Sequence, residues 1–172
     1  MAEMNNIVKN WHVAPILFGV VLCTLFIACR PNSSASSAPN VTFITLQNKH
    51  ISMASLKGKV VLVSFWATYC PGCKTEMPDL INTYNHYKNK GLEVIAVAVQ
   101  DDPPINVVNY AADKKLPFPV MDDGLGQVTA AFGGIEGTPT AFIYDKNGKL
   151  LQRITGVIDF AKLRVLLEKE LS

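Results

Sequence analysis

The sequence predicts a single α/β domain with a central mixed β-sheet flanked by helices. Two continuous apolar runs, residues 59–67 and 92–99, are rich in β-branched side chains, which is typical of central strands covered on both faces. The amphipathic segment at residues 71–89 lies between them, and this strand–helix–strand order makes the two strands parallel. The dipeptide Asn147-Gly148 between two later apolar runs indicates an antiparallel hairpin.

The composition agrees with one domain that has a good-sized core. Of the 172 residues, 49% are hydrophobic and 17% are charged, and the net charge is only +2. Lysine and arginine occur singly or in short pairs, so the chain shows no basic patch for phosphate groups. We therefore expect no nucleic-acid partner.

An apolar stretch of 19 residues, at 11–29, precedes a Ser-rich segment. Its length lies between a signal-peptide core and a full membrane span, and its end resembles a bacterial lipoprotein processing site that would lipidate Cys29. A buried core helix is the alternative, but the low-complexity segment that follows argues against it. We expect a membrane anchor or signal/lipoprotein segment over residues 1–30, a flexible tether over residues 31–40 and a folded domain over residues 41–172. The domain would lie in the periplasm or outside the cytoplasmic membrane of a bacterial cell envelope.

The folded domain is expected to begin with a short strand and a loop region. Residues 41–45 alternate like an edge strand, and residues 46–58 indicate turns and loops. The central strand at residues 59–67 follows and ends directly at a pair of cysteines. Apolar residues then recur at spacings of three and four over residues 71–89, which predicts an amphipathic helix that ends at Gly91.

A second helix is predicted over residues 104–116, after the second buried strand. Pro104 suits the first helical position. Ile105, Val108 and Ala112 fall on one side of this helix, which makes that side its apparent apolar face.

The remaining elements follow in short segments. A short strand is predicted over residues 117–123, a short helix over residues 125–133 and a hairpin over residues 140–156. The last helix spans residues 159–171 and has Asp159 at its cap. Its inward residues are expected to be Phe160, Leu163, Leu166 and Leu167.

Cys70 and Cys73 lie at the start of the first predicted helix. Cys70 falls near the N-cap and Pro71 at the first helical position, where unpaired backbone N–H groups and the helix dipole favour a negative charge. We therefore expect the Cys70 thiol to have a pKa below the free value of about 8.5 and to act as the nucleophile. Cys73, one helical turn further on and facing inward, is placed to attack the resulting mixed disulfide.

Two other uses of the cysteine pair fit the sequence less well. A structural zinc site needs four ligands, yet the sequence has no second Cys-x-x-Cys, and His12, His50 and His86 are scattered. A purely structural disulfide gains little from closing so short a loop. We therefore expect no metal, and no cofactor apart from the redox-active disulfide itself.

The run from residue 60 through Trp-Ala-Thr-Tyr-Cys-Pro-Gly-Cys to Glu-Met-Pro at residues 76–78, together with Gly-Thr-Pro-Thr at residues 137–140, resembles the thioredoxin superfamily. More closely, residues 41–172 are similar to the membrane-tethered TlpA/ResA-type thiol-disulfide oxidoreductases. The resemblance implies a thioredoxin-like fold with a helix–strand insertion over residues 100–121. It also agrees with an N-terminal anchor.

The resemblance implies roles for several site residues. Glu76 would tune the cysteine pair. As a partly desolvated carboxylate it would have a raised pKa and could take or return the proton of Cys73. The alternative is that Glu76 is a solvated residue on the helix face. Pro139 would be cis beside the sulfurs and the backbone of Thr138 would bind the substrate chain, although the sequence itself leaves the cis and trans forms open. Ser64 stands where thioredoxins carry a buried Asp.

Four residues around the cysteines are expected to contact the substrate as well. Trp66 is expected half in the core and half as a platform beside the sulfurs, and Tyr69 either shapes the exposed rim or has an ordinary packing role. Pro71 and Gly72 complete this set. Relatives usually place proline next to the second cysteine, so the reduction potential cannot be taken from the family.

The leading interpretation is an enzyme that exchanges its Cys70–Cys73 disulfide with the thiols and disulfides of extracytoplasmic protein substrates. The resemblance favours a monomeric disulfide reductase, bound to the membrane through its N-terminal segment and recharged by a membrane electron donor, with cytochrome c maturation as a typical task. One alternative is a thiol peroxidase-like antioxidant protein, although residues 67–70 do not match the pattern of that group. The other is a tethered binding or chaperone module with non-catalytic cysteines.

Overall fold

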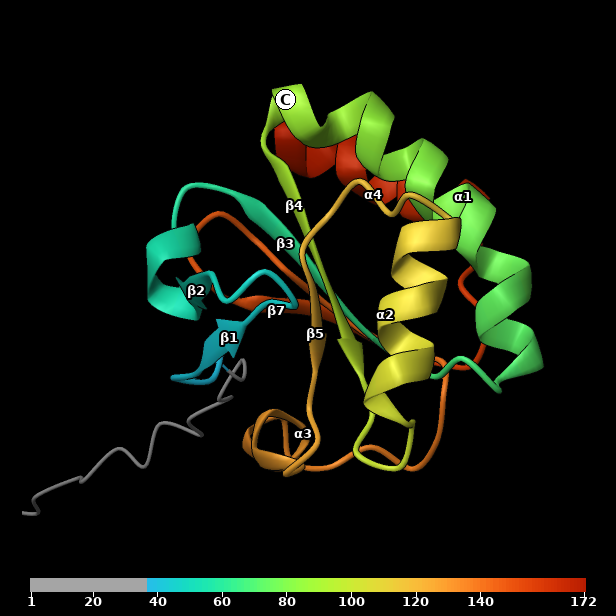
Figure 1. The fold of residues 1–172 in the computed structure, drawn as a ribbon. Coiled ribbons are helices and arrows are strands. Elements are labelled where there is room, and N and C mark those ends of the chain that lie inside the picture. The colour runs from blue at the N-terminus through green and yellow to red at the C-terminus, as the bar shows by residue number, and fades with distance from the viewer. Residues whose placement is uncertain (1–36) are drawn as a thin grey trace, which may run out of the picture. The chain divides into compact units, whose positions relative to one another are not determined.

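The computed structural model describes residues 37–172, which form a central β-sheet covered by helices (Figure 1). The predicted membrane segment, most of the predicted tether and Cys29 lie outside the described residues. Over residues 37–172, no helix combines the length and the apolar character needed to cross a bilayer.

The central sheet is mixed, as predicted. Its strands are β3 (Val60–Trp66), β4 (Leu92–Ala98), β5 (Val120–Asp122), β6 (Thr140–Tyr144) and β7 (Leu150–Thr155). They are arranged in the order β5-β4-β3-β6-β7. β4 pairs in parallel with β3 and β5, whereas β6 pairs antiparallel with β3 and β7. Every residue of β3 is buried, because this central strand is covered on both faces.

Helices cover both faces of this sheet (Figure 1). They are α1 (Pro71–Tyr87), α2 (Pro104–Asp113), α3 (Gln127–Ala131) and α4 (Phe160–Leu171). α1 packs against α4 and β4, and α2 packs against β5. Trp66 of β3 lies against Tyr110 of α2, whereas the preceding residue, Phe65, packs against Phe132 after α3. Successive strand residues point to opposite faces, so α2 and Phe132 lie on different sides of the sheet.

Two helix ends form as the sequence predicts. Asp159 accepts hydrogen bonds from Ala161 N and Lys162 N, both at 3.1 Å, and so caps α4. α1 is followed by a short 3-10 helix, η2 (Lys88–Lys90), which ends at Gly91. Gly91 has a φ of 107°, in the left-handed region that glycine adopts most easily.

The region predicted as turns and loops, residues 46–58, contains regular structure, so that prediction is wrong. A strand, β2 (His50–Ser52), pairs antiparallel with β1 (Thr42–Ile44). The strand predicted over residues 41–45 therefore exists, but it belongs to a separate two-stranded sheet and forms no edge of the central one. Strands of three residues are too short for an alternating pattern to stand out in the sequence.

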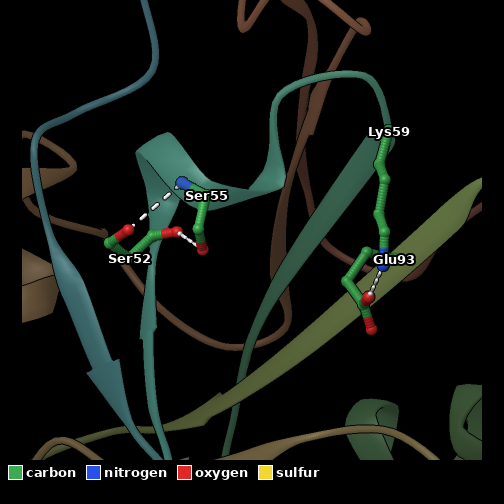
Figure 2. A network of polar contacts seen from close by, with 4 residues as sticks. All are labelled: Ser52, Ser55, Lys59 and Glu93. Atoms are coloured by element: carbon green, nitrogen blue, oxygen red, sulfur yellow. Dashed lines mark hydrogen bonds and ion pairs between the residues drawn. The ribbon is translucent and has the colours of Figure 1, made fainter.

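Polar contacts hold this region and the start of the central sheet (Figure 2). The Ser52 hydroxyl caps a 3-10 helix, η1 (Met53–Leu56), by accepting from Ser55 N at 3.1 Å, and Ser55 Oγ donates to Ser52 O at 2.7 Å. Next to it, Lys59 Nζ lies 2.6 Å from Glu93 Oε2. This ion pair joins the beginnings of β3 and β4, which run in parallel.

The buried face of α2 differs from the one that the sequence indicates. Ile105 and Val108 are 63% and 45% exposed and Ala112 is exposed, whereas Val107 is fully buried. The prediction is wrong because apolar residues stand on both sides of this helix, and the sheet covers the side that carries Val107 and Tyr110.

Three parallel strands end where β6 begins, and we call this the site edge of the sheet. Trp66 at the end of β3 lies opposite Ala98 at the end of β4, which in turn lies opposite Asp122 at the end of β5. On the other side of β3, Phe65 lies opposite Thr140, the first residue of β6. The loops that leave this edge carry the cysteine pair and Pro139.

The described chain begins at the opposite end of the sheet. Ser37 forms a β-bridge with Lys149 in the β6–β7 hairpin, and Ala38 N donates to Gly148 O at 2.8 Å. Residues 37–40, which the sequence assigns to the tether, are therefore docked on the domain at the end away from the site edge.

Candidate active site

The cysteine pair lies where β3 ends and α1 begins. Cys70 is the N-cap residue of α1, and its Sγ accepts a hydrogen bond from Cys73 N at 3.1 Å, while Pro71 occupies the first turn. Cys70 and Cys73 form a disulfide, with Cα atoms 5.3 Å apart. Cys70 is 6% exposed and Cys73 only 1%. Solvent therefore reaches the first sulfur more readily than the second.

Pro139 packs beside the segment between the cysteines. The Thr138–Pro139 peptide bond is cis, which answers a question that the sequence leaves open. A Cβ atom on Gly72 would lie 3.3 Å from Pro139 Cδ and 3.1 Å from Val157 Cγ2. Both distances are tighter than an ordinary van der Waals contact, so the close approach of two loops explains why glycine precedes Cys73.

Glu76 is a buried carboxyl on the same face of α1 as Cys73, three residues away. It is 3% exposed, and its Oε2 accepts a hydrogen bond from Ile158 N at 3.0 Å. Burial raises the pKa of Glu76 from 4.5 to about 7, although the Ile158 N–H acts in the opposite direction. The alternative of a solvated helix-face residue is therefore wrong.

Tyr69 forms part of the exposed rim next to Cys70. Its side chain is 53% exposed, and its hydroxyl donates to Asp101 Oδ2 at 2.6 Å. This hydrogen bond is the main cause that raises the pKa of Tyr69 to about 12. A groove of about 630 Å³ opens beside it, and its lining includes Tyr69, Asp101, Glu136 and Thr138.

Trp66 does not reach the rim. It is 1% exposed and its ring centroid lies 5.1 Å from that of Tyr110, a half-buried residue of α2. The expectation that half of its side chain forms a platform for the substrate beside the sulfurs is wrong, because the ring is buried and Tyr110 of α2 packs against it. Pro71, by contrast, is exposed and Gly72 is partly exposed.

Sequence reasoning missed Asp101 and Asp102, which reach the site from the loop after β4. Asp102 is 1% exposed and accepts hydrogen bonds from the backbone N–H and the hydroxyl of Thr68, two residues before Cys70. A signal was present, since two consecutive aspartates stand three and four residues after the last residue of β4, a strand whose end lies at the site edge. Ile158, which binds Glu76, left no such signal because it acts through its backbone.

Within residues 37–172, no three His, Cys, Asp or Glu side chains are placed to hold a metal ion together. The described site brings together two sulfurs, one buried carboxyl and an adjoining groove. Cys29, the predicted lipidation site, lies outside the described residues.

Comparisons with known proteins agree with this geometry. The Redoxin family pattern matches residues 33–166. The chain is 39% identical to the thiol-disulfide oxidoreductase ResA of Bacillus thuringiensis subsp. konkukian, covering 97% of this chain and 98% of that protein. It is 36% identical to the ResA of Bacillus subtilis, covering 73% and 69%. Among solved structures, a thioredoxin-family thiol:disulfide interchange protein from Chlorobium tepidum superposes with a TM-score of 0.72 at 33% identity, covering 79% of this chain and 96% of that one.

Proposed function

The chain belongs to the Redoxin family and is a TlpA/ResA-like thiol-disulfide oxidoreductase of the thioredoxin superfamily, and we propose that it reduces disulfides in protein substrates outside the cytoplasm. The observation that carries this proposal is the position of the disulfide, with Cys70 at the N-cap of α1 and Cys73 one turn further in. The substrate, the direction of electron flow and the compartment are parts of the proposal.

The proposed reaction begins with the reduced enzyme. The Cys70 thiolate attacks one sulfur of a substrate disulfide, so that a Cys70–substrate disulfide forms and the other substrate sulfur leaves as a thiolate. The Cys73 thiol then loses its proton and attacks Cys70 Sγ, which releases the second substrate thiolate. Both substrate thiolates take up protons, so the substrate gains two electrons and two protons and the enzyme ends as the Cys70–Cys73 disulfide.

Glu76 is the proposed acceptor for the Cys73 proton. It shares a buried helix face with Cys73, where solvent cannot take the proton easily. A pKa of about 7 makes its carboxylate basic enough to act near neutral pH, which is what a general base requires. When a membrane electron donor reduces the disulfide again, Glu76 would return the proton.

The charges around the pair support reduction over oxidation. Glu76 is buried on the face of α1 that carries Cys73, and Asp101 and Asp102 are bound to the two residues before Cys70. Negative charge near the pair opposes the stabilisation that the helix start gives to the Cys70 thiolate, and a less stable reduced form makes a stronger reductant. Lys74, the basic neighbour of Cys73, has an exposed side chain and so offsets little of this charge.

The groove beside Tyr69 is the proposed binding site for the substrate chain. Its lining includes Thr138, directly before the cis proline, and we expect a bound chain to lie along the Thr138 backbone with its disulfide over Cys70. Asp101 and Glu136 make the groove acidic, and Tyr69 and Pro71 offer exposed contact surface next to the sulfur.

The location and the biological task are also proposed. The apolar stretch at residues 11–29 supports an N-terminal anchor or signal segment, with a tether behind it and the folded domain outside the cytoplasmic membrane. In that compartment, a dedicated reductant is needed where cysteines must stay reduced, as for haem attachment in cytochrome c maturation. We propose that task, with a membrane protein as the electron donor.

Trapping of substrates tests this function. The Cys73→Ala variant of the full-length chain keeps the attacking sulfur but cannot release a bound substrate, so envelope proteins should accumulate in mixed disulfides at Cys70. Mass spectrometry after acid quenching and alkylation would identify them, and apocytochrome c is expected among them. The double variant Cys70→Ala/Cys73→Ala is the control. Absence of mixed disulfides, or oxidation of Cys70 by peroxide at the rate of a peroxidase, would contradict the proposal.

A further inference from the structure

Two reverse turns lie next to each other at the site edge, one after β3 and one after β4. In the first turn Cys70 N donates to Ala67 O at 3.2 Å, and in the second Asp102 N donates to Val99 O at 3.0 Å. Val99 N also donates to Trp66 O at 3.1 Å, which joins the two turns through their backbones. Cys70 is therefore the last residue of the first turn, which is hydrogen-bonded to the second turn through the backbone.

Side chains of the second turn bind both central residues of the first. The backbone N–H of Thr68 donates to Asp102 Oδ2, and the Thr68 hydroxyl donates to Asp102 Oδ1 at 2.6 Å. Asp101 accepts from the Tyr69 hydroxyl, also at 2.6 Å. The short segment that ends at Cys70 is thus held by two carboxylates from another loop.

Asp102 occupies a position that is unfavourable for a carboxylate. It is 1% exposed, and burial of a charge costs free energy unless hydrogen bonds satisfy it. Asp123 is also buried at the end of β5, and the charges of Asp102 and Asp123 add to burial in raising the pKa of Asp122. A buried carboxyl held only by hydrogen bonds is a poor source of stability, which favours a role in geometry.

We propose that Asp102, acting through Thr68, is a positioning residue that holds the Cys70 turn so that Cys70 Sγ caps α1. This inference rests on the proposed exchange function, because it concerns the same attacking sulfur. Placement matters there, since a misplacement of about 1 Å can cost about 100-fold in rate. The Asp101–Tyr69 contact acts in the same way but more weakly, because Tyr69 is half exposed.

Thr68→Val tests this role without changing any charge. It removes the hydroxyl donor to Asp102 and keeps the shape of the side chain, whereas Thr68→Ser keeps the hydroxyl. In the Val variant we expect exchange with a small-molecule disulfide to slow about tenfold. We also expect Cys70 to titrate at higher pH, because its hydrogen bond from Cys73 N is less well formed. Ultraviolet absorbance of the thiolate follows this titration. The Ser variant should behave like the unchanged protein.

Thr45→Val is the matched control. Thr45 is buried, whereas Thr68 is half-buried, and Thr45 Oγ1 accepts from Lys49 N at 3.1 Å; Thr45 lies in the turn between β1 and β2, away from the site edge. This variant should lose stability and leave the Cys70 titration unchanged. If Asp102 has only a structural role, Thr68→Val should likewise lose stability and leave the Cys70 titration unchanged. That result would overturn the proposal.

A second variant keeps the test decisive. If Thr68→Val does not fold, Tyr69→Phe removes the other contact at an exposed position and should shift the Cys70 titration in the same direction by less; an unchanged titration there would overturn the proposal. Neither readout needs a protein substrate. If only the proposed reductase function is wrong, the Cys73→Ala variant will trap no mixed disulfides in the envelope, whereas Thr68→Val will still shift the titration of Cys70.

Discussion

At the scale of single residues, Glu76 shows how burial raises the pKa of a carboxyl until it can exchange a proton near neutral pH. A carboxyl in water is ionised at neutral pH, but Glu76 is 3% exposed and its pKa is about 7. The hydrogen bond from Ile158 N offsets only part of the burial. Glu76 can therefore gain and lose a proton in the pH range in which Cys73 must do the same.

The pKa of Glu76 also makes stability depend on pH. Because the folded state binds this proton more tightly than the unfolded chain, the contribution of Glu76 to stability is fully present below about pH 4.5 and is lost as pH rises through about 7. Glu76→Gln removes this dependence. The free energy of unfolding of this variant, taken relative to that of the unchanged protein, should therefore be higher at pH 8 than at pH 4 by roughly 3 kcal/mol. Urea unfolding of the oxidised protein at both pH values measures the difference.

Glu136→Gln is the control for this measurement, because Glu136 is exposed. It should change stability by a similar small amount at both pH values. If Glu76→Gln also shifted the unfolding free energy equally at pH 4 and pH 8, the carboxyl would not titrate near neutrality and could not serve as the proposed base.

Gly72 offers a second test at this scale. A methyl group there would meet Pro139, which is buried, and Val157, which is 52% exposed and can move. Gly72→Ala should therefore destabilise the oxidised protein by about 1 kcal/mol, and Val157→Ala in the same chain should recover part of this loss. Thermal unfolding measures both. Gly137→Ala is the control, since a methyl group there meets no atom within 4 Å; an equal loss at Gly137 would show that packing against Pro139 is not the cause.

At the scale of elements, α2 is the clearest case in which packing decides between two faces. Val107 is fully buried and Val108 is 45% exposed, although they are neighbours of the same type. Val107→Ala should reduce the free energy of unfolding by about 2 kcal/mol, whereas Val108→Ala should change it by less than about 0.5 kcal/mol. Equilibrium unfolding in urea distinguishes them, and equal effects would contradict the observed orientation of the helix.

The elements that the sequence predicts well are those with a strong local pattern. β3 and β4 are long apolar runs, α1 has a regular helical period, and α4 has Asp159 at its cap. β2 and η1 are too short for a pattern, so they appear only in the structure. The face of α2 could not be predicted, because the choice depends on which strand the helix covers.

At the scale of the whole molecule, the site is assembled from loops that are far apart in sequence. The cysteines and Glu76 could be predicted because they lie in one motif on one helix. Asp102 reaches Thr68 over 34 positions and Ile158 reaches Glu76 over 82. Such contacts depend on which loops meet at the site edge, and this follows from the strand order rather than from any local pattern.

The direction of electron flow is the central claim, and it also belongs to the whole molecule because it depends on the carboxylates that several loops bring to the cysteine pair. The reduction potential of Cys70–Cys73, measured by equilibration with glutathione buffers, tests it most directly. We predict a value near that of thioredoxin, about −270 mV, because the carboxylates near the pair oppose the stabilisation of the Cys70 thiolate by the helix start and so make the reduced form less stable. A value near that of strong disulfide oxidants, about −120 mV, would contradict the proposed reductase.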